Sequence, residues 1–339
     1  MDIARFFIPI IAGGGFKLPY SLDFSLGSMG KLIGTKAAIV GGVLTNTPGE
    51  SANIITTDPG LEATYTAGLC ATLAKTGTPT VAESADAHGG SKAQEFTGAA
   101  LNNTLAYAAH AGVAGGWYKM SMWGKRTAGA GGTAQVQVYQ GSSLPVATNV
   151  VAILSAAYAK ETVGFISTST NNIIPYAVRE GNTTGFDTVI VDDGELVRLT
   201  YADLFSMISN PLPNRLATVK VQPDTLVDCS LSGIVAWANA NASPDTYLLC
   251  YWRYRTPKDR ISFGLMKCVA GTWTSLIAET SAVTVANAWL EIRPVDADTV
   301  GMYYNNVQIS TDKDVADVPG AYAGMVISGG NNVKSFFVG

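Results

Sequence analysis

The sequence is poor in charge and in histidine, and each shortage excludes a class of function. Charged residues make up 14% of the 339 residues and the formal net charge is −4. Such a chain has no electrostatic footprint for nucleic acid or anionic lipid, so neither is an expected partner. His88 and His110 are the only histidines, which excludes a histidine-rich metal centre and leaves a Ser-His-Asp triad only these two candidates.

Cysteine is also scarce. Cys70, Cys229, Cys250 and Cys268 are the only cysteines, too few and too dispersed for a disulfide framework, and none has the CxxC spacing of a metal or redox site. We expect them to be small buried hydrophobic residues.

Long apolar runs are missing. The run from Phe6 to Ala12 is too short to cross a bilayer, and Pro9 interrupts it. We therefore expect no membrane span and no cleaved secretion signal. An exposed "FFIPII" is costly in water, so residues 1–17 are predicted to form an anchor peptide that is buried against other proteins of an assembly. The anchor side chains would be Phe6, Phe7, Ile8, Ile10 and Ile11. Packing on the chain's own domain is the alternative.

What the chain does have is typical of short strands joined by tight turns. It contains 36 Gly and 14 Pro and is rich in Thr, Val, Ala and Asn, which favours an all-β fold. Its length is enough to bury more than one core, so two domains are expected.

Alternating patterns predict individual strands. "WYKMSMWGK" from Trp117, "AQVQVYQ" and "DTVIVDDGELVRLT" each follow the two-residue period of a sheet. "DTYLLCYWRYR" places Leu248, Cys250, Trp252 and Tyr254 on one face and Leu249, Tyr251, Arg253 and Arg255 on the other, which predicts one face in the core and one in water. Asn305 and Asn306 predict a hairpin turn. Short helices are expected over 69–75 and 202–208.

Two resemblances organise these strands. "DPGLE", "GGWYKMSMWGKR" and "FDTVIVDDGELVRL" resemble carbohydrate-binding-module-like jelly rolls over roughly Ile54 to Leu199. In such modules a structural calcium ion is often held by an acid of the opening strand and an acid of the closing strand. The resemblance thus implies Glu62 with Asp192 or Asp193 as ligands, and loop carbonyls would supply the rest of about six to eight oxygens. A solvated acid pair at a strand end is the alternative.

The second resemblance covers the remainder. "KAAIVGGVLTNTP" looks like the first strands, and "DRISFGLMKCVAGTW" with the tail beyond it looks like the later strands, of a concanavalin-like or laminin-G-like sandwich. The prediction is two β-sandwich (jelly-roll) domains, with 51–203 inserted into a domain made of 18–50 and 204–339. Chains with this nested pattern are similar to minor structural proteins of tailed bacteriophages, of the tail-tip, fibre or head-decoration type.

Catalysis is not expected. Glycoside hydrolysis needs two carboxylates at a controlled separation, and the Glu-x-Asp-x-x-Glu pattern of concanavalin-like hydrolases does not occur in the sequence. Asp192 and Asp193 are adjacent, so on a regular strand their side chains point to opposite faces and cannot form a dyad.

Sugar recognition uses aromatic faces together with a few polar hydrogen-bonding groups. The candidate glycan-binding residues are Trp117, Trp123, Tyr139, Tyr176 and Trp252, and core packing is the alternative for each.

The expected function is therefore that of a non-enzymatic virion protein of a tailed phage, attached through its N-terminus, with the inserted jelly roll displaying a surface for host glycan. Repeated attachment sites favour a homo-oligomer, and a trimer is expected by analogy. A free bacterial carbohydrate-binding protein is the alternative.

Overall fold

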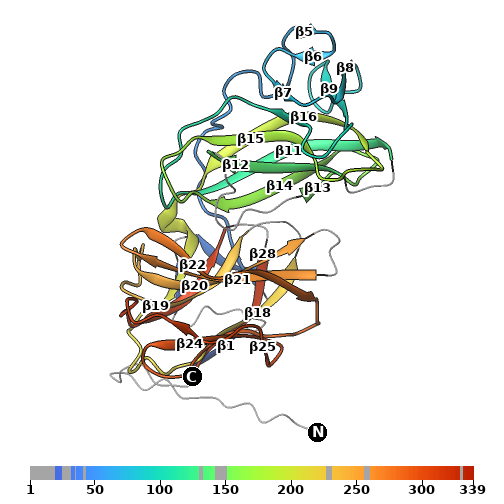
Figure 1. Ribbon diagram of the computed structural model, residues 1–339. Coiled ribbons are helices and arrows are strands. Elements are labelled where there is room, and N and C mark those ends of the chain that lie inside the picture. Colours follow the sequence, from blue (N-terminus) through green and yellow to red (C-terminus); the bar gives the residue numbers. More distant parts are fainter. Residues whose placement is uncertain are drawn as a thin grey trace.

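The computed structural model describes residues 20–24, 32–34, 36–40, 43–129, 133–141, 151–226, 231–255, 260–328 and 331–339. The anchor residues Phe6, Phe7, Ile8, Ile10 and Ile11 lie outside this set, as does Cys229. Strands make up almost all of the regular secondary structure of the described chain (Figure 1), which confirms the all-β prediction. One turn of 3₁₀ helix, η2 (Tyr201–Leu204), lies between two of the strands.

Four large sheets are paired as two sandwiches. Sandwich A is made of sheets I and II and occupies the lower half of Figure 1. Sheet I has the order β25 (Val307–Gln308), β24 (Thr299–Tyr304), β23 (Leu290–Pro294), β18 (Val219–Leu226), β28 (Asn331–Val338), β4 (Val43–Asn46) and β3 (Ala37–Val40), with β1 (Tyr20–Asp23) on β28 and β26 (Lys313–Asp314) on β24. Sheet II has the order β2 (Leu32–Ile33), β17 (Phe205–Ile208), β27 (Tyr322–Ile327), β19 (Ser232–Ala238), β20 (Tyr247–Arg255), β21 (Arg260–Val269) and β22 (Thr272–Val283).

Sandwich B is made of sheets III and IV and occupies the upper half of Figure 1. Sheet III has the order β13 (Val151–Ala152), β12 (Ala134–Gln140), β15 (Ile173–Glu180), β10 (Thr104–Ala106) and β7 (Ala74–Thr76). Sheet IV has the order β14 (Ala159–Ile166), β11 (Trp117–Ala128), β16 (Thr188–Arg198), β9 (Ala93–Thr97) and β8 (Thr80–Ser84). A small ribbon of β5 (Tyr65–Thr66) and β6 (Leu69–Cys70) lies beside them.

Strands from the start of the chain pair with strands from its end. Tyr20 in β1 lies opposite Val338 in β28, and Ile33 in β2 lies opposite Met207 in β17. Every strand pair of sandwich B, in contrast, joins residues between 74 and 198. This pairing is the one that a nested arrangement requires. The boundaries at 51 and 203, and independent folding of the two parts, stay predictions.

The two segments that join the sandwiches run side by side. Ser51 N donates to Arg198 O at 2.9 Å, and Thr200 N donates to Gly49 O at 2.7 Å. Beside them the buried Asn46 uses its amide nitrogen to reach the main-chain carbonyls of Asp203 at 2.7 Å and Ile327 at 2.9 Å. Asn46 lies on the segment that leads into sandwich B. Its amide therefore connects this segment to the one that leaves sandwich B, at Asp203, and to β27, at Ile327.

Three hydrophobic cores hold the layers. One fills sandwich A between sheets I and II and contains Trp252, which is 0% exposed. A second fills sandwich B between sheets III and IV. The third lies between the other face of sheet II and the end of sandwich B, where Trp117 and Ile166 meet Leu249 and Tyr251.

The third core corrects the prediction for β20. Its two-residue alternation is present, but Leu249 and Tyr251 are buried rather than in water, because sandwich B covers this face of sheet II. Sheet II is covered on both faces, which is why several of its strands are apolar on both sides.

The local predictions had mixed outcomes. The hairpin turn is confirmed, with positive φ at Asn305 and Asn306 (50° and 63°). The helix over 69–75 is wrong, since this stretch contains β6 and β7. The helix over 202–208 is right only for the turn η2, because Phe205 starts a strand that pairs with β27.

Candidate functional site

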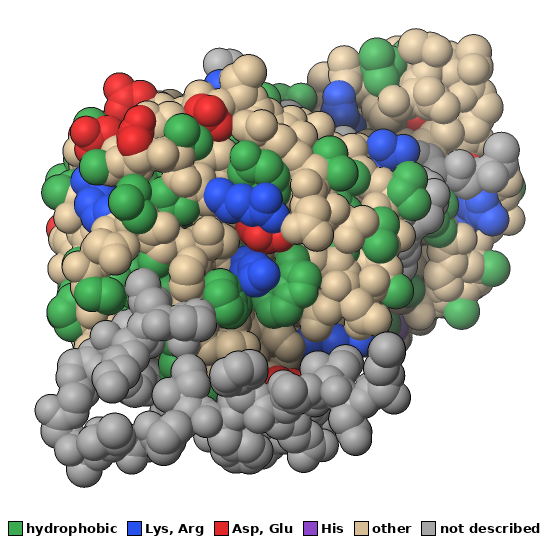
Figure 2. Space-filling view, turned by 90° about the horizontal axis from the view of Figure 1, so that it is seen from below, with side chains coloured by type: hydrophobic (Ala, Val, Ile, Leu, Met, Phe, Trp, Pro, Cys, Tyr) green, Lys and Arg blue, Asp and Glu red, His purple; other side chains and the backbone are tan. Residues whose placement is uncertain are grey.

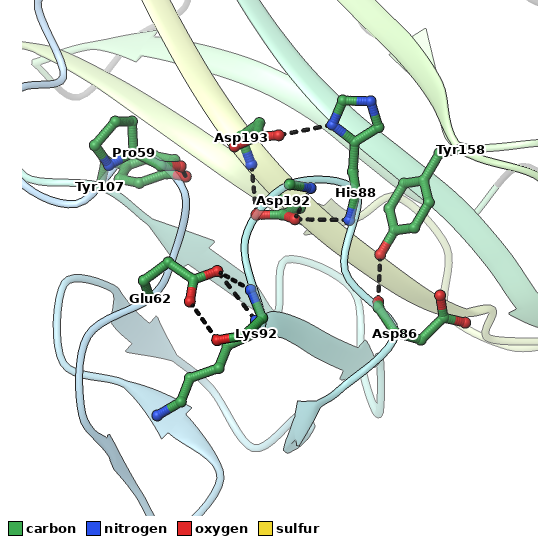
Figure 3. A network of polar contacts seen from close by, with 11 residues as sticks. Pro59, Glu62, Asp86, His88, Lys92, Tyr107, Tyr158, Asp192 and Asp193 are labelled. Carbon is green, nitrogen blue, oxygen red and sulfur yellow. Dashed lines mark hydrogen bonds and ion pairs between the residues drawn. The ribbon is translucent and has the colours of Figure 1, made fainter.

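Two carboxylates hold the loop 85–92 between β8 and β9 (Figure 3). Asp192, which is fully buried in β16, accepts hydrogen bonds from His88 N at 2.8 Å and Gly89 N at 3.1 Å. Glu62 holds the other end of the loop, where it accepts from Ser91 N at 2.8 Å and Lys92 N at 3.0 Å. The loop is thus fixed at consecutive backbone N–H groups by acids from two separate segments.

The arrangement of Asp192 and Asp193 differs from the sequence expectation. Asp193 Oδ2 accepts a hydrogen bond from His88 Nδ1 at 2.6 Å, so both carboxyl groups approach the same residue. The reason is a bulge: β16 has an extra residue against Ser121 and Trp123 of β11, and Asp193 has φ of 48°. A bulge breaks the strict alternation of a strand and redirects one side chain.

Burial and hydrogen bonding move the pKa values of the two loop-holding acids in opposite directions. Burial, reinforced by repulsion from Asp193, raises the pKa of Asp192 to about 6, although N–H donors oppose the rise. The pKa of Glu62 is lowered, chiefly by the backbone N–H groups of Lys92 and Ser91. The charged form of Glu62 is therefore favoured, whereas that of Asp192 is disfavoured.

The calcium ligands implied by the resemblance do not converge in this arrangement. Asp192 and Asp193 lie at the His88 end of the loop and Glu62 at the Lys92 end (Figure 3). Among the residues that the structure describes, no three His, Cys, Asp or Glu side chains gather as a metal-binding group. The carboxylate oxygens face N–H donors instead, and a cation would have to displace these. The residues as arranged do not fit a calcium ion.

Trp123 belongs to the same loop cluster. The His88 ring stacks on Trp123 with centroids 3.8 Å apart and planes 13° apart, and Tyr158 meets His88 edge-on at 5.6 Å. Tyr158 in turn donates to the carbonyl of Asp86 at 2.6 Å. One face of Trp123 is therefore covered by the chain's own imidazole, and the aromatic group acts as a support for the loop.

A different set of side chains lies on the outward face of sheet III, on the side away from the core of sandwich B. Here Tyr139 of β12 and Tyr176 of β15 meet edge-to-face, with centroids 5.3 Å apart and an angle of 61°. Both rings are half-buried. A bulge in β15 turns Ala177 and Val178 into the core together, which leaves Tyr176 and Arg179 both on the outward face.

The register defines the neighbours of the tyrosine pair. Gln137 lies opposite Tyr176, and Gln135 lies opposite Arg179. Gln137 is only 2% exposed, and in the described part of the chain its Oε1 has no hydrogen-bond partner. A buried acceptor without a donor is uncommon in folded proteins.

The other aromatic candidates are buried. Trp117 is 1% exposed in the core between the sandwiches, and Trp252 is 0% exposed inside sandwich A. Neither offers a ring face to a sugar, so packing is their role in this structure. Of the five aromatic candidates, Tyr139 and Tyr176 are the two that the fold brings together.

Sequence reasoning missed Gln137 and Arg179. A signal for the first was present, because "AQVQVYQ" places Val136 and Val138 on one face and therefore Gln135, Gln137 and Tyr139 on the other. No such signal marks Arg179, because its direction depends on the bulge.

No protein-family model matches the chain, and a search of curated proteins finds no significant relative. In the part of the chain described by the structure, no helix is long and apolar enough to cross a bilayer.

Proposed function

We propose that the protein is a non-enzymatic structural component of a tailed-phage particle that presents the outward face of sheet III to host glycan. The observation that supports this best is the pairing of Tyr139 and Tyr176 beside Gln137 and Arg179 on that face. Tyrosine rings supply surface for a sugar ring, and amide and guanidinium groups supply hydrogen bonds in fixed positions.

The rest of the proposal has two supports. The resemblance of the two sequence patterns to phage tail and decoration proteins favours a role in a virion, with residues 1–17 as the anchor and a trimer as the assembly. The strand pairing adds that β1 and β28, the first and last of the described strands, lie side by side in sheet I. In Figure 1 sandwich B lies at the end of the molecule away from β1.

Glycan binding is tested on a printed panel of bacterial and animal oligosaccharides. We expect Tyr139→Ala and Tyr176→Ala each to weaken binding by about 10-fold or more, the effect of removing one aromatic contact with a sugar. The matched control is Tyr303→Ala, which removes a half-buried tyrosine from sheet I. Equal loss in all three variants, or no loss in the first two, would contradict the assignment of this face.

The virion role is tested by deletion of residues 1–17. The shortened chain should remain folded and soluble but should no longer be incorporated into particles. Unaltered incorporation would refute the anchor. A free bacterial carbohydrate-binding protein would keep its glycan affinity after the deletion and would have no particle to join.

A further inference from the structure

One row of side chains on the outward face of sheet III contains a charged residue, Arg179, and this charge affects which glycans the face could bind. Thr104, Arg179 and Gln135 lie side by side across β10, β15 and β12. The next row holds Ala106, Tyr176 and Gln137. Thr104 and Ala106 have short side chains, so the longer side chains on this face come from β15 and β12.

The positive charge of Arg179 is not balanced by a neighbouring acid. Among the described residues the guanidinium makes no ion pair, and its side-chain hydrogen bond goes to the neutral Asn102. Glu180 follows it in the strand, but this side chain points to the other side of the sheet and is 0% exposed. A guanidinium has five N–H donors in a planar fork, so most of its donors remain for a ligand.

The position of the guanidinium connects it to the tyrosine pair. Its central carbon lies 6.0 Å from the ring centroid of Tyr139, near the outer limit for attraction between a cation and a ring. Its charge also opposes the rise in the pKa of Tyr176 that burial causes. A sugar ring resting on the tyrosines would therefore have a cation at its edge.

We infer that the glycan taken by this face carries a carboxylate, which Arg179 binds while Tyr139 and Tyr176 contact the sugar ring. This inference rests on the proposed glycan-binding function. A guanidinium matches a carboxylate with two parallel N–H···O bonds, and such charge-assisted pairs are stronger than neutral ones. The ligand class is thus an oligosaccharide of uronic or other carboxylated sugars, not a neutral one.

Matched acidic and neutral probes test the inference. Sialyllactose is compared with lactose, and oligogalacturonate is compared with its methyl ester, which keeps the sugar chain but removes the charge. The acidic members of the wider panel are included in the same assay. We expect binding of a carboxylated probe that falls as NaCl is raised, because salt screens the pair. Arg179→Gln should weaken it about 10- to 100-fold.

Two further variants separate charge from structure. Arg179→Lys keeps the charge but loses the fork, so it should recover only part of the affinity. Lys220→Gln, which removes a cation from sheet I, should leave binding unchanged. Thermal unfolding of each variant shows that it is folded.

The outcomes are distinct. A glycan bound equally well with and without its carboxylate, and unaffected by Arg179→Gln, would overturn the inference while leaving the glycan-binding function in place. No binding to any glycan of the panel would overturn the proposed function and the inference with it.

Discussion

The outward faces of sheets I and III both carry aromatic rings and cations, but the cations lie at different distances from the rings. On sheet I, at the lower end of the molecule, the Lys220 ammonium lies 4.8 Å from the ring centroid of Trp289 and 4.7 Å from that of Phe337. Arg293 lies 4.1 Å from the ring centroid of Tyr303 and pairs with Glu291 at 2.9 Å. Figure 2 shows this lower face, where basic side chains lie among hydrophobic ones.

On sheet III the cation is farther from the ring. The guanidinium carbon of Arg179 lies 6.0 Å from the ring centroid of Tyr139, and its side-chain hydrogen bond goes to the neutral Asn102. The comparison teaches that residue type alone does not define a binding face. On sheet I the cations lie close to the rings, whereas on sheet III the guanidinium lies farther from the ring and hydrogen-bonds to the neutral Asn102. Each prediction below tests one part of this contrast.

The largest effect should come from a tryptophan that lies on neither face. Trp252→Ala removes a fully buried ring from the core of sandwich A and should lower the free energy of unfolding by about 3–5 kcal/mol. Urea denaturation measures this. Trp289→Ala, the matched change on the outward face of sheet I, should cost less than about 2 kcal/mol. Equal costs would mean that Trp252 does not have the core role assigned to it.

The next effect concerns the junction that holds the two sandwiches together. Asn46→Ala leaves the carbonyls of Asp203 and Ile327 without their donor, so unfolding should become easier by about 1–3 kcal/mol. The neighbouring Thr45→Ala removes an exposed hydrogen bond to Ala38 and should change stability by less than about 0.5 kcal/mol. If the two variants behave alike in urea, the junction is not tied by Asn46.

A pH effect should come from the loop of sandwich B. The pKa of Asp192 is raised to about 6, above its ordinary value of 3.8. The folded state therefore holds this proton more tightly than the unfolded state. The resulting stability is fully present below 3.8 and is lost as the pH rises through about 6. Between pH 5 and pH 7 the wild type should lose about 1 kcal/mol more than Asp192→Asn, after allowance for screening by solvent. Unfolding curves at the two pH values give the difference, and parallel curves for both proteins would show that Asp192 does not titrate in this range.

The smallest effect should come from the cation on sheet I. Lys220→Met removes the charge between Trp289 and Phe337 and should lower stability by about 0.5–1 kcal/mol. Lys75→Met, at an exposed position of β7, should have no measurable effect. If Lys220→Met lowers the free energy of unfolding as much as Asn46→Ala does, Lys220 has a larger structural role than two surface cation–ring contacts.

The sequence predicted features set by local chemistry. Period-two alternation located β11, β12, β16 and β20, and the Asn305–Asn306 pair located a turn. The prediction for 69–75 failed because β6 closes a tight hairpin with β5 and β7 pairs with the distant β10, and local helix preference records neither pairing.

Side-chain direction near the site was less accessible to sequence reasoning. An extra residue in β16 brings Asp193 to the same loop as Asp192, and another in β15 turns Arg179 outward. A bulge is visible only when both paired strands are known, so neither arrangement follows from one strand's pattern. The burial of Tyr251 likewise depends on a contact between sandwiches that belongs to no single segment.

The chain enters sandwich B at Gly49 and leaves it at Thr200, and these two residues are hydrogen-bonded to each other. Sandwich B is therefore attached to sandwich A through two adjacent segments. Another module whose termini lie close together could be grafted there without rerouting sheets I and II. The surface of that module facing sheet II would have to cover Leu249 and Tyr251, because these apolar side chains would otherwise be exposed to water. A replacement module would therefore need an apolar surface on the side that faces sheet II.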